Sequence, residues 1–299
     1  MSDQPGEILL SEDDFCAARS LAAAEPMLGT AIAGVRYWLV LEYPGPWGAK
    51  ALAESGLPGP VKERLATLEH DLGARVQFIK QANQVAGSTI RLYVADAEPT
   101  RPALFHFDLA DYRDLLEIDL AGLIQGTVAY EERRSDELLF LVCTNGRRDR
   151  CCAKWGLPVW AAGHAVAPEA CWQTTHIGGH RFAATLVTLP HGLVYGRIEP
   201  GEMRSLMAAH NSGKCYRLDR LRGRSAYDPA VQAAEGVLRE ALDQFDLMGL
   251  ALDSVSAADT RTRVTFTQGG CLLYTSPSPR DLIAHLVCRL LLEKRGGGG

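Results

Sequence analysis

Apolar residues along the chain alternate between short strand-like runs and longer helical patterns. The first strand is predicted at residues 36–42, where RYWLVLE is rich in aromatic and branched apolar side chains. The helical pattern VKERLATLEHDLG follows it. Three further strands and a short helix are predicted at 74–81, 89–97, 103–110 and 111–118. The order β-α-β-β-β-α predicts an open α/β sheet.

A second series of elements begins with a strand at 137–143, and a helix is predicted to begin near Cys152. The runs FAATLVTL and GLVYGRIEP alternate like strands around a turn at 190–192. Two helices and a last strand are predicted at 201–210, 228–245 and 262–267. The order β-α-β-β-α is typical of a thioredoxin-like domain. The first series is consistent with a distant copy of it, in pattern rather than in residues.

These patterns predict two domains, an α/β domain at residues 1–133 and a thioredoxin-like domain at 134–270. The remaining segment, 271–299, begins with CLLYTSPSPRD, which resembles the translation of a sequencing adapter. We therefore expect this tail to be non-native and to supply no residue to a site. The alternative is a natural C-terminal helix, because LIAHLVCRLLLEKR is apolar at helical spacing.

The composition is that of a soluble globular protein, with 47% hydrophobic and 22% charged residues among 299. The net charge of −5 argues against binding to nucleic acid or to an anionic membrane. No apolar run reaches the roughly 18 residues that cross a bilayer. The acidic N-terminus lacks the order of a signal peptide. We expect a cytoplasmic protein, whose reduced cysteines serve as metal ligands or redox groups.

Two cysteines stand at the ends of neighbouring predicted elements. Cys143 closes the strand at its C-terminal end, and Cys152 stands at the start of the following helix. A helix N-terminus lowers the pKa of a thiol, and the thiolate is the form that binds metal. The loop between them carries Arg147, Arg148 and Arg150, and these cations favour thiolates and a bound anionic centre.

A histidine pair follows in the run HIGGH, as His176 and His180. Gly178 and Gly179 argue against a helix here and favour a tight loop, in which the backbone can closely approach a bulky ligand. Two thiolates and two imidazoles that converge on one point would make a metal site.

The residues alone leave two other readings open. Two cysteines and two histidines also suit structural zinc, although eight residues between the cysteines exceed the usual spacing of about two to four. A thioredoxin-type thiol oxidoreductase would use Cys151 or Cys152 as its nucleophile, but no C-x-x-C motif follows the strand. Spacing alone does not decide which of these two cysteines is a ligand.

The runs CTNGRRDRCCAKWG and HIGGHRFAATLVTLPHGLVYGRIEP resemble the sucrase/ferredoxin-like family, as do EPMLGTA, RYWLVLEYPGPWG and RLRGRSAYDPAVQAAE. The resemblance covers most of the chain before the tail. It implies a thioredoxin-like ferredoxin in which Cys143, Cys152, His176 and His180 hold a 2Fe-2S cluster. The family's spacing selects Cys152 over Cys151. The word sucrase in the family name does not predict sugar hydrolysis here.

The resemblance implies an electron carrier rather than an enzyme. Histidine ligation raises the potential, as in Rieske centres, to roughly −150 to +300 mV against about −400 mV for plant-type ferredoxins. The second ring nitrogen of each histidine can lose a proton, so we expect proton-coupled electron transfer with a potential that falls as pH rises. The expected partner is an unidentified redox protein. Arg147, Arg148 and Arg150 either dock its acidic surface or balance the charge of the centre.

Overall fold

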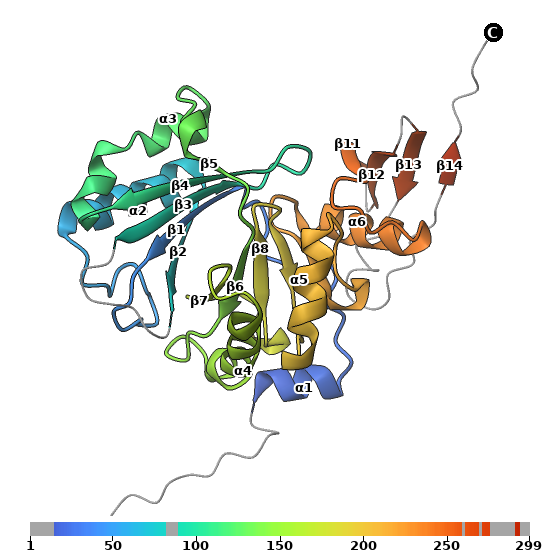
Figure 1. The fold of residues 1–299 in the computed structure, drawn as a ribbon. Helices are drawn as coiled ribbons and strands as arrows, with labels where there is room; N and C mark the ends of the chain where they lie inside the picture. Colours follow the sequence, from blue (N-terminus) through green and yellow to red (C-terminus); the bar gives the residue numbers. More distant parts are fainter. Residues whose placement is uncertain (1–14, 82–88, 259–260, 269–270, 276–290, 294–299) are drawn as a thin grey trace, which may run out of the picture.

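The computed structural model describes residues 15–81, 89–258, 261–268, 271–275 and 291–293. The described residues fold around one ten-stranded mixed sheet covered by helices, with a four-stranded sheet beside the last helix (Figure 1). Within this part of the chain, every helix is too short or too polar to cross a bilayer.

The first half of the large sheet follows the short helix α1 (Cys16–Ala22). Its elements are β1 (Tyr37–Glu42), α2 (Gly59–Leu72), β2 (Arg75–Lys80), β3 (Ile90–Asp96), β4 (Ala103–Leu109), the 3-10 helix η2 (Tyr112–Glu117), α3 (Leu120–Gln125), η3 (Glu131–Arg133) and β5 (Arg134–Ser135). β1 pairs parallel with β2 and antiparallel with β3, and β4 and β5 continue antiparallel. The strand order is therefore β2-β1-β3-β4-β5.

The second half repeats this arrangement. Its elements are β6 (Leu139–Cys143), α4 (Arg150–Val166), β7 (Cys171–Thr174), η4 (His180–Phe182), β8 (Leu186–Leu189), β9 (Leu193–Tyr195), η5 (Pro200–Glu202), α5 (Met203–Asn211), η6 (Leu218–Arg220) and β10 (Leu221–Arg224). β6 pairs parallel with β7 and antiparallel with β8, which gives the order β7-β6-β8-β9-β10. The α/β, thioredoxin-like fold class predicted from the sequence is confirmed.

The two halves meet at β2 and β7, which lie side by side and antiparallel. Ile79 is opposite Thr174 and Lys80 is opposite Gln173. The predicted domain boundary, between residues 133 and 134, falls between η3 and β5, and β5 pairs with β4 of the first half. Because one sheet runs through both halves, each half helps to position the other.

Side chains on the two faces of the sheet join different apolar clusters, as the alternation of a strand requires. Leu39 and Leu41 of β1 pack with α2, and Phe140 and Val142 of β6 pack with α4 and α5. Alternate residues of the same strands point to the other face. There they join one cluster shared by both halves, which includes Trp38, Val40, Ile79, Tyr93, Leu141, Cys143, Cys152 and Trp172.

The C-terminal part adds α6 (Pro229–Ala241) and four strands, β11 (Ala251–Ala258), β12 (Arg261–Gln268), β13 (Cys271–Thr275) and β14 (Leu291–Glu293). They pair in that order, and Val231 and Leu238 of α6 pack against Phe266 of β12. β13 and β14 fall within the segment that resembles an adapter, and the origin of that segment stays a prediction.

Several predicted elements differ in length from those observed. Of the run 182–189, only Leu186–Leu189 forms a strand, because Phe182 closes η4 and pairing with β6 begins at Leu186. The run 192–200 is a strand only at Leu193–Tyr195. β7 was not predicted, since its four residues, CWQT, form too short a run to stand out.

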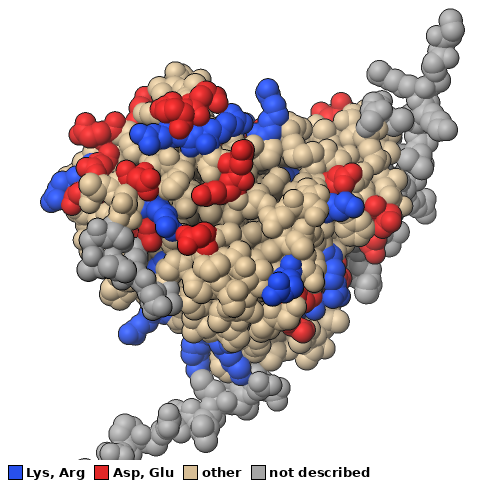
Figure 2. Space-filling view, viewed as in Figure 1, with Lys and Arg blue, Asp and Glu red and all other residues tan. Residues whose placement is uncertain are grey.

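Charged side chains are interspersed on the face shown in Figure 2. Acidic and basic groups alternate over the first half, and a broad uncharged area lies in the middle of the same face. Neither sign dominates the described residues in this view, as a net charge of −5 over 299 residues leads one to expect.

Candidate metal centre

Three predicted ligands come from three neighbouring elements. Cys143 is the last residue of β6, Cys152 lies in the first turn of α4, and His176 follows β7. β6 and β7 are parallel, with Cys143 opposite Thr174, so both strands end at the same edge of the sheet. The helix that connects them begins at that edge, which brings all three side chains together.

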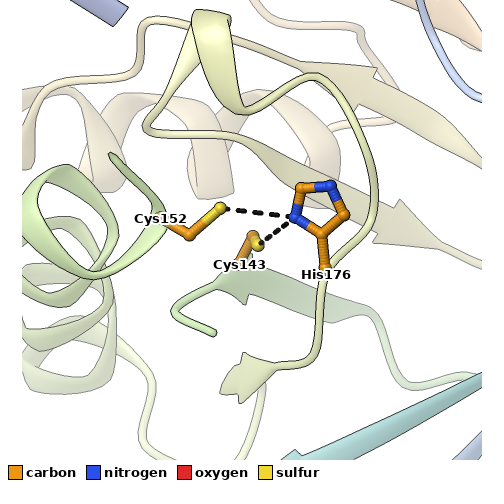
Figure 3. A group of neighbouring side chains, drawn as sticks. All are labelled: Cys143, Cys152 and His176. Atoms are coloured by element: carbon orange, nitrogen blue, oxygen red, sulfur yellow. Dashed lines mark hydrogen bonds between the residues drawn. The ribbon is translucent and has the colours of Figure 1, made fainter. Parts of the chain in front are cut away.

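The three side chains point toward one another (Figure 3). One donor atom from each of them lies within 4.8 Å of the other two. His176 Nδ1 is 3.4 Å from Cys152 Sγ and 3.9 Å from Cys143 Sγ. Both cysteines are only 1% exposed, whereas His176 is half-buried. Two thiols and an imidazole at these distances suit a thiophilic metal ion or an iron–sulfur cluster.

The two thiols share their charge unequally. A hydrogen bond from Cys152 holds the pKa of Cys143 well below its usual range against the effect of burial, and His176 adds to the lowering. The same hydrogen bond, together with burial, raises the pKa of Cys152. The pair therefore readily carries one negative charge, and the second thiolate forms when a bound cation compensates it.

His180 lies on the same loop but outside this group of three. Its ring centroid is 6.2 Å from that of His176, and its side chain is 40% exposed. His180 Nε2 is 3.6 Å from Asp149 Oδ2. Asp149 is also the N-cap of α4, where its Oδ1 accepts a hydrogen bond from Cys151 N. A carboxylate in this position orients the histidine ring and leaves Nδ1 free for a metal.

The loop between the two histidines depends on glycine. Gly178 and Gly179 have φ angles of 94° and 72°, a region that other residues rarely adopt. A Cβ on Gly179 would also collide with the Arg222 guanidinium. Arg222 Nη1 donates to Gly178 O at 3.1 Å, and its other nitrogens donate to Thr30 Oγ1 and Thr30 O. Arg222 thus ties the histidine loop to the N-terminal segment.

Arg222 is a buried cation close to the thiols. Its side chain is 2% exposed, and no carboxylate among the described residues pairs with it. Burial lowers its pKa to about 10, with Arg181 adding to the effect, while the nearby Cys143 acts in the opposite direction. A buried positive charge without a carboxylate partner stabilises negative charge at Cys143.

Two further residues shape the site and were not identified from the sequence. Gly156 of α4 lies so close to β6 that a Cβ there would collide with the Cys143 carbonyl oxygen. Arg75, at the start of β2 in the first half, donates from Nη2 to His176 O at 3.1 Å. Gly156 ends the run CTNGRRDRCCAKWG but offers no ligand atom, and Arg75 acts through a contact with a segment distant in sequence.

The neighbouring cysteine Cys151 points away from the group. It packs with Ala17 of α1 and Ala183, and burial raises its pKa. Successive helical residues point about 100° apart, so only one of the two adjacent cysteines can face the other ligands. In the structure that residue is Cys152.

The loop arginines are exposed beside the site. Arg147, Arg148 and Arg150 are all solvent-accessible. The Arg150 guanidinium lies 5.6 Å from the centroid of the Phe15 ring, and Arg148 lines a cavity together with His176. They are available both to a partner and to the charge balance of the centre.

Comparison with known proteins adds the family. No curated protein and no solved structure matched the chain. The sucrase/ferredoxin-like family profile matches residues 28–223, about two thirds of the chain, and this range includes the three converging residues and His180. The cysteine and histidine group and the extent of the match together lead to one conclusion: the chain belongs to the sucrase/ferredoxin-like family.

Proposed function

We propose that this protein transfers electrons and that Cys143, Cys152, His176 and His180 hold its 2Fe-2S cluster. The observation that carries the proposal is the convergence of Cys143 Sγ, Cys152 Sγ and His176 Nδ1 within 4.8 Å. A bound cluster would supply one-electron redox chemistry at this point. The donor set fits it, because two thiolates and two imidazoles are also the ligands of Rieske centres.

The charges around the site support a centre that is negative in at least one redox state. Arg222 is buried beside Cys143 without a carboxylate partner among the described residues. The N-terminus of α4 adds the positive end of its helix dipole at Cys152. An unpaired buried cation costs several kcal/mol, and a neighbouring anion offsets that cost.

The histidines supply the proton coupling in this proposal. His176 presents Nδ1 to both sulfur atoms, which leaves Nε2 for a proton. His180 Nε2 lies near Asp149 Oδ2, which can accept its N–H. A ring that binds metal through one nitrogen holds its remaining proton more weakly when the metal is more positive. We therefore expect a reduction potential that falls as pH rises between about pH 6 and about pH 10.

The partner in this proposal is a redox protein with an acidic surface. Arg147, Arg148 and Arg150 are exposed next to the ligands, where they can steer such a partner electrostatically. Arg147→Glu is expected to slow electron transfer with the partner and to leave the visible spectrum unchanged. A charge-balancing role alone predicts an altered spectrum or potential instead.

The deciding experiment is an anaerobic absorption and EPR spectrum of the full chain, together with metal and sulfide analysis. We expect a red-brown protein with about two iron atoms and two sulfides per chain. His176→Cys and His180→Cys should each retain colour while shifting the spectrum and lowering the potential. His70→Cys, at an exposed position on α2, is the matched control and should change neither.

A colourless protein with one tightly bound zinc would instead identify a structural zinc site of the Cys2His2 type. A coloured protein whose potential does not vary with pH would exclude histidine ligation. The two cysteines would then be the only ligands of the proposed set that remain.

A further inference from the structure

A cavity of about 620 Å³ opens beside His176, between the two halves of the molecule. The first half contributes residues 49–53, one face of α2 and the beginning of β2. The second half contributes Asn145 and Arg148 from the loop after β6, and Thr175 and His176 from the loop after β7. Cavities of this volume typically hold small organic molecules.

The first half contributes apolar stretches of wall beside its charged side chains. Leu52, Ala66 and Val76 form these stretches, together with the alanines of the segment 49–53. Such walls favour the body of an organic molecule over a bare inorganic ion, because they offer area for contact and few polar partners.

Positive charge predominates among the ionisable lining residues. Four of them are cations and two are carboxylates, namely Lys50, Lys62, Arg75 and Arg148 against Glu63 and Glu69. Arg75 is engaged by His176 O, and Lys62 Nζ donates to Ser55 O at 3.3 Å. Within the described residues, the side-chain nitrogens of Lys50 and Arg148 have neither a hydrogen bond nor an ion pair. These two exposed cations are therefore available to an anionic group.

Contacts between the two halves hold the walls in place. Asn145 Nδ2 donates to Gly48 O at 3.1 Å, and Arg75 Nη2 donates to His176 O at the same distance. Arg148 N donates in turn to Asn145 Oδ1 at 3.3 Å. These hydrogen bonds hold the cavity in shape before a ligand binds, so binding costs little conformational entropy.

We propose that this cavity binds a small organic anion, with its apolar body against Leu52, Ala66 and Val76 and its acidic group at Lys50 and Arg148. The bound molecule contacts His176, so ligand binding in the cavity changes the potential of the metal centre. Binding itself does not require the proposed cluster, because residues of the cavity make the contacts. Only the coupling to the centre rests on the proposed function.

A pair of fluorescent probes that differ in one acidic group tests the binding. 8-Anilinonaphthalene-1-sulfonate carries a sulfonate, and N-phenyl-1-naphthylamine has the same aromatic body without it. Titrated into the full chain, the anion should bind about tenfold more tightly than the neutral probe. Arg148→Gln and Lys50→Gln should each weaken the anion about fivefold and leave the neutral probe unchanged.

Matched variants show whether the probes occupy this cavity. Ala66→Trp fills it and should abolish binding of both probes. Thr67→Trp adds the same side chain one residue later, at an exposed position of α2 outside the lining, and should bind as the wild type does. Arg147→Gln removes the same charge as Arg148→Gln from a residue outside the lining and should leave the anion's affinity unchanged.

Several results would overturn the proposal. One is equal affinity for the two probes, and another is undiminished binding in a folded Ala66→Trp variant. A third is equal weakening by Arg147→Gln and Arg148→Gln, which would show a diffuse charge effect. Pentaglutamate that binds as tightly as the aromatic sulfonate would identify an acidic protein segment as the occupant and exclude a small molecule.

The coupling to the metal centre is measured separately. Saturating 8-anilinonaphthalene-1-sulfonate should shift the potential of the metal-loaded wild type and should leave that of Ala66→Trp unchanged. A bound probe without any shift overturns the coupling. A zinc-containing protein would overturn the proposed function, while the titrations would still decide whether the cavity binds the anion.

Discussion

The two halves of the sheet repeat one strand order but place different chemistry at the end of their first strand. β1 ends at Glu42, which is buried and whose Oε2 accepts a hydrogen bond from Arg91 N. β6 ends at Cys143, whose sulfur faces Cys152 and His176. The two halves share this backbone arrangement (Figure 1). It positions a hydrogen-bonded carboxylate in one half and a candidate metal centre in the other.

The connection to the helix explains much of this difference. Residues 43–58 lie between β1 and α2, whereas only residues 144–149 lie between β6 and α4. The short connection starts α4 directly at the end of β6, so a thiol in its first turn reaches Cys143. The first half contributes differently, through the Arg75 hydrogen bond and one wall of the cavity. Because the fold is repeated, the first half can support the site that the second half holds.

The largest expected effect is loss of the metal from the second half. Cys152→Ser replaces a thiolate with a hydroxyl that binds soft metals poorly, so bound iron or zinc should fall by orders of magnitude. Cys151→Ser changes the adjacent residue, which faces α1, and should leave the metal content as in the wild type. Metal analysis of both purified variants checks this. The reverse pattern would show that α4 presents the other cysteine.

Helix packing should also differ between the halves. Gly156→Ala forces a Cβ against the Cys143 carbonyl and should reduce the free energy of unfolding by at least about 2 kcal/mol. Gly59→Ala, at the start of α2, meets nothing within 4 Å and should change it by less than about 1 kcal/mol. Urea unfolding compares them. Equal effects would mean that α4 packs no more closely on its strand than α2 does.

Acid sensitivity should arise mainly in the second half. Burial lowers the pKa of His191 to about 4 and that of His210 to about 3, against 6.5 for a free histidine. His191 contributes to the lowered pKa of His210, Arg224 contributes to both lowered pKa values, and His210 Nε2 is 2.9 Å from Tyr195 Oη. Both rings are neutral when folded and gain a proton on unfolding below about pH 6.5.

Stability is therefore complete above that pH and falls between about pH 6.5 and the folded values. At pH 5 each histidine should cost about 2 kcal/mol. His210→Gln should flatten the acid limb of unfolding free energy against pH, while His70→Gln, at an exposed position of the first half, should not. An unchanged limb in His210→Gln would mean that other groups govern acid unfolding.

The smallest expected effect tests the contact between the halves. Arg75→Met removes the donor that holds His176 O and should weaken metal binding about tenfold, with little loss of global stability. Arg64→Met removes the same charge from α2 outside the cavity and is the matched control. Chelator competition measures both affinities. If the two variants behave alike, the first half supports the fold but not the centre.

Much of the architecture was predictable because the patterns that specify it are local. Predicted strands correspond to β1, β2, β3, β4, β6, β8, β9 and β12, and predicted helices to α2, α4, α5 and α6. The predicted strand length was wrong where tertiary contacts make the strand shorter than the apolar run, as at Phe182, which belongs to η4. β7 was missed because its pairing with two neighbouring strands, rather than its four residues, makes it a strand.

The candidate site was likewise predictable only in part. Cys143, Cys152, His176 and His180 stood out in the sequence by residue type and spacing. The structure brings the first three together and places His180 beside Asp149. The arginines that support the site could not be predicted from the sequence, because their burial and their hydrogen bonds depend on residues distant in the chain.

The sequence by itself determined the α/β class, the order of most elements and the donor types available to a metal. These depend on hydrophobic periodicity and on residue type, which are local properties of the sequence. Only the tertiary structure decided that one sheet joins both halves through β2 and β7. It also decided that Cys152 rather than Cys151 faces Cys143, that Arg222 is buried beside them, and that a cavity opens at His176. These features depend on which distant segments meet, and that is settled by packing and pairing across the whole chain.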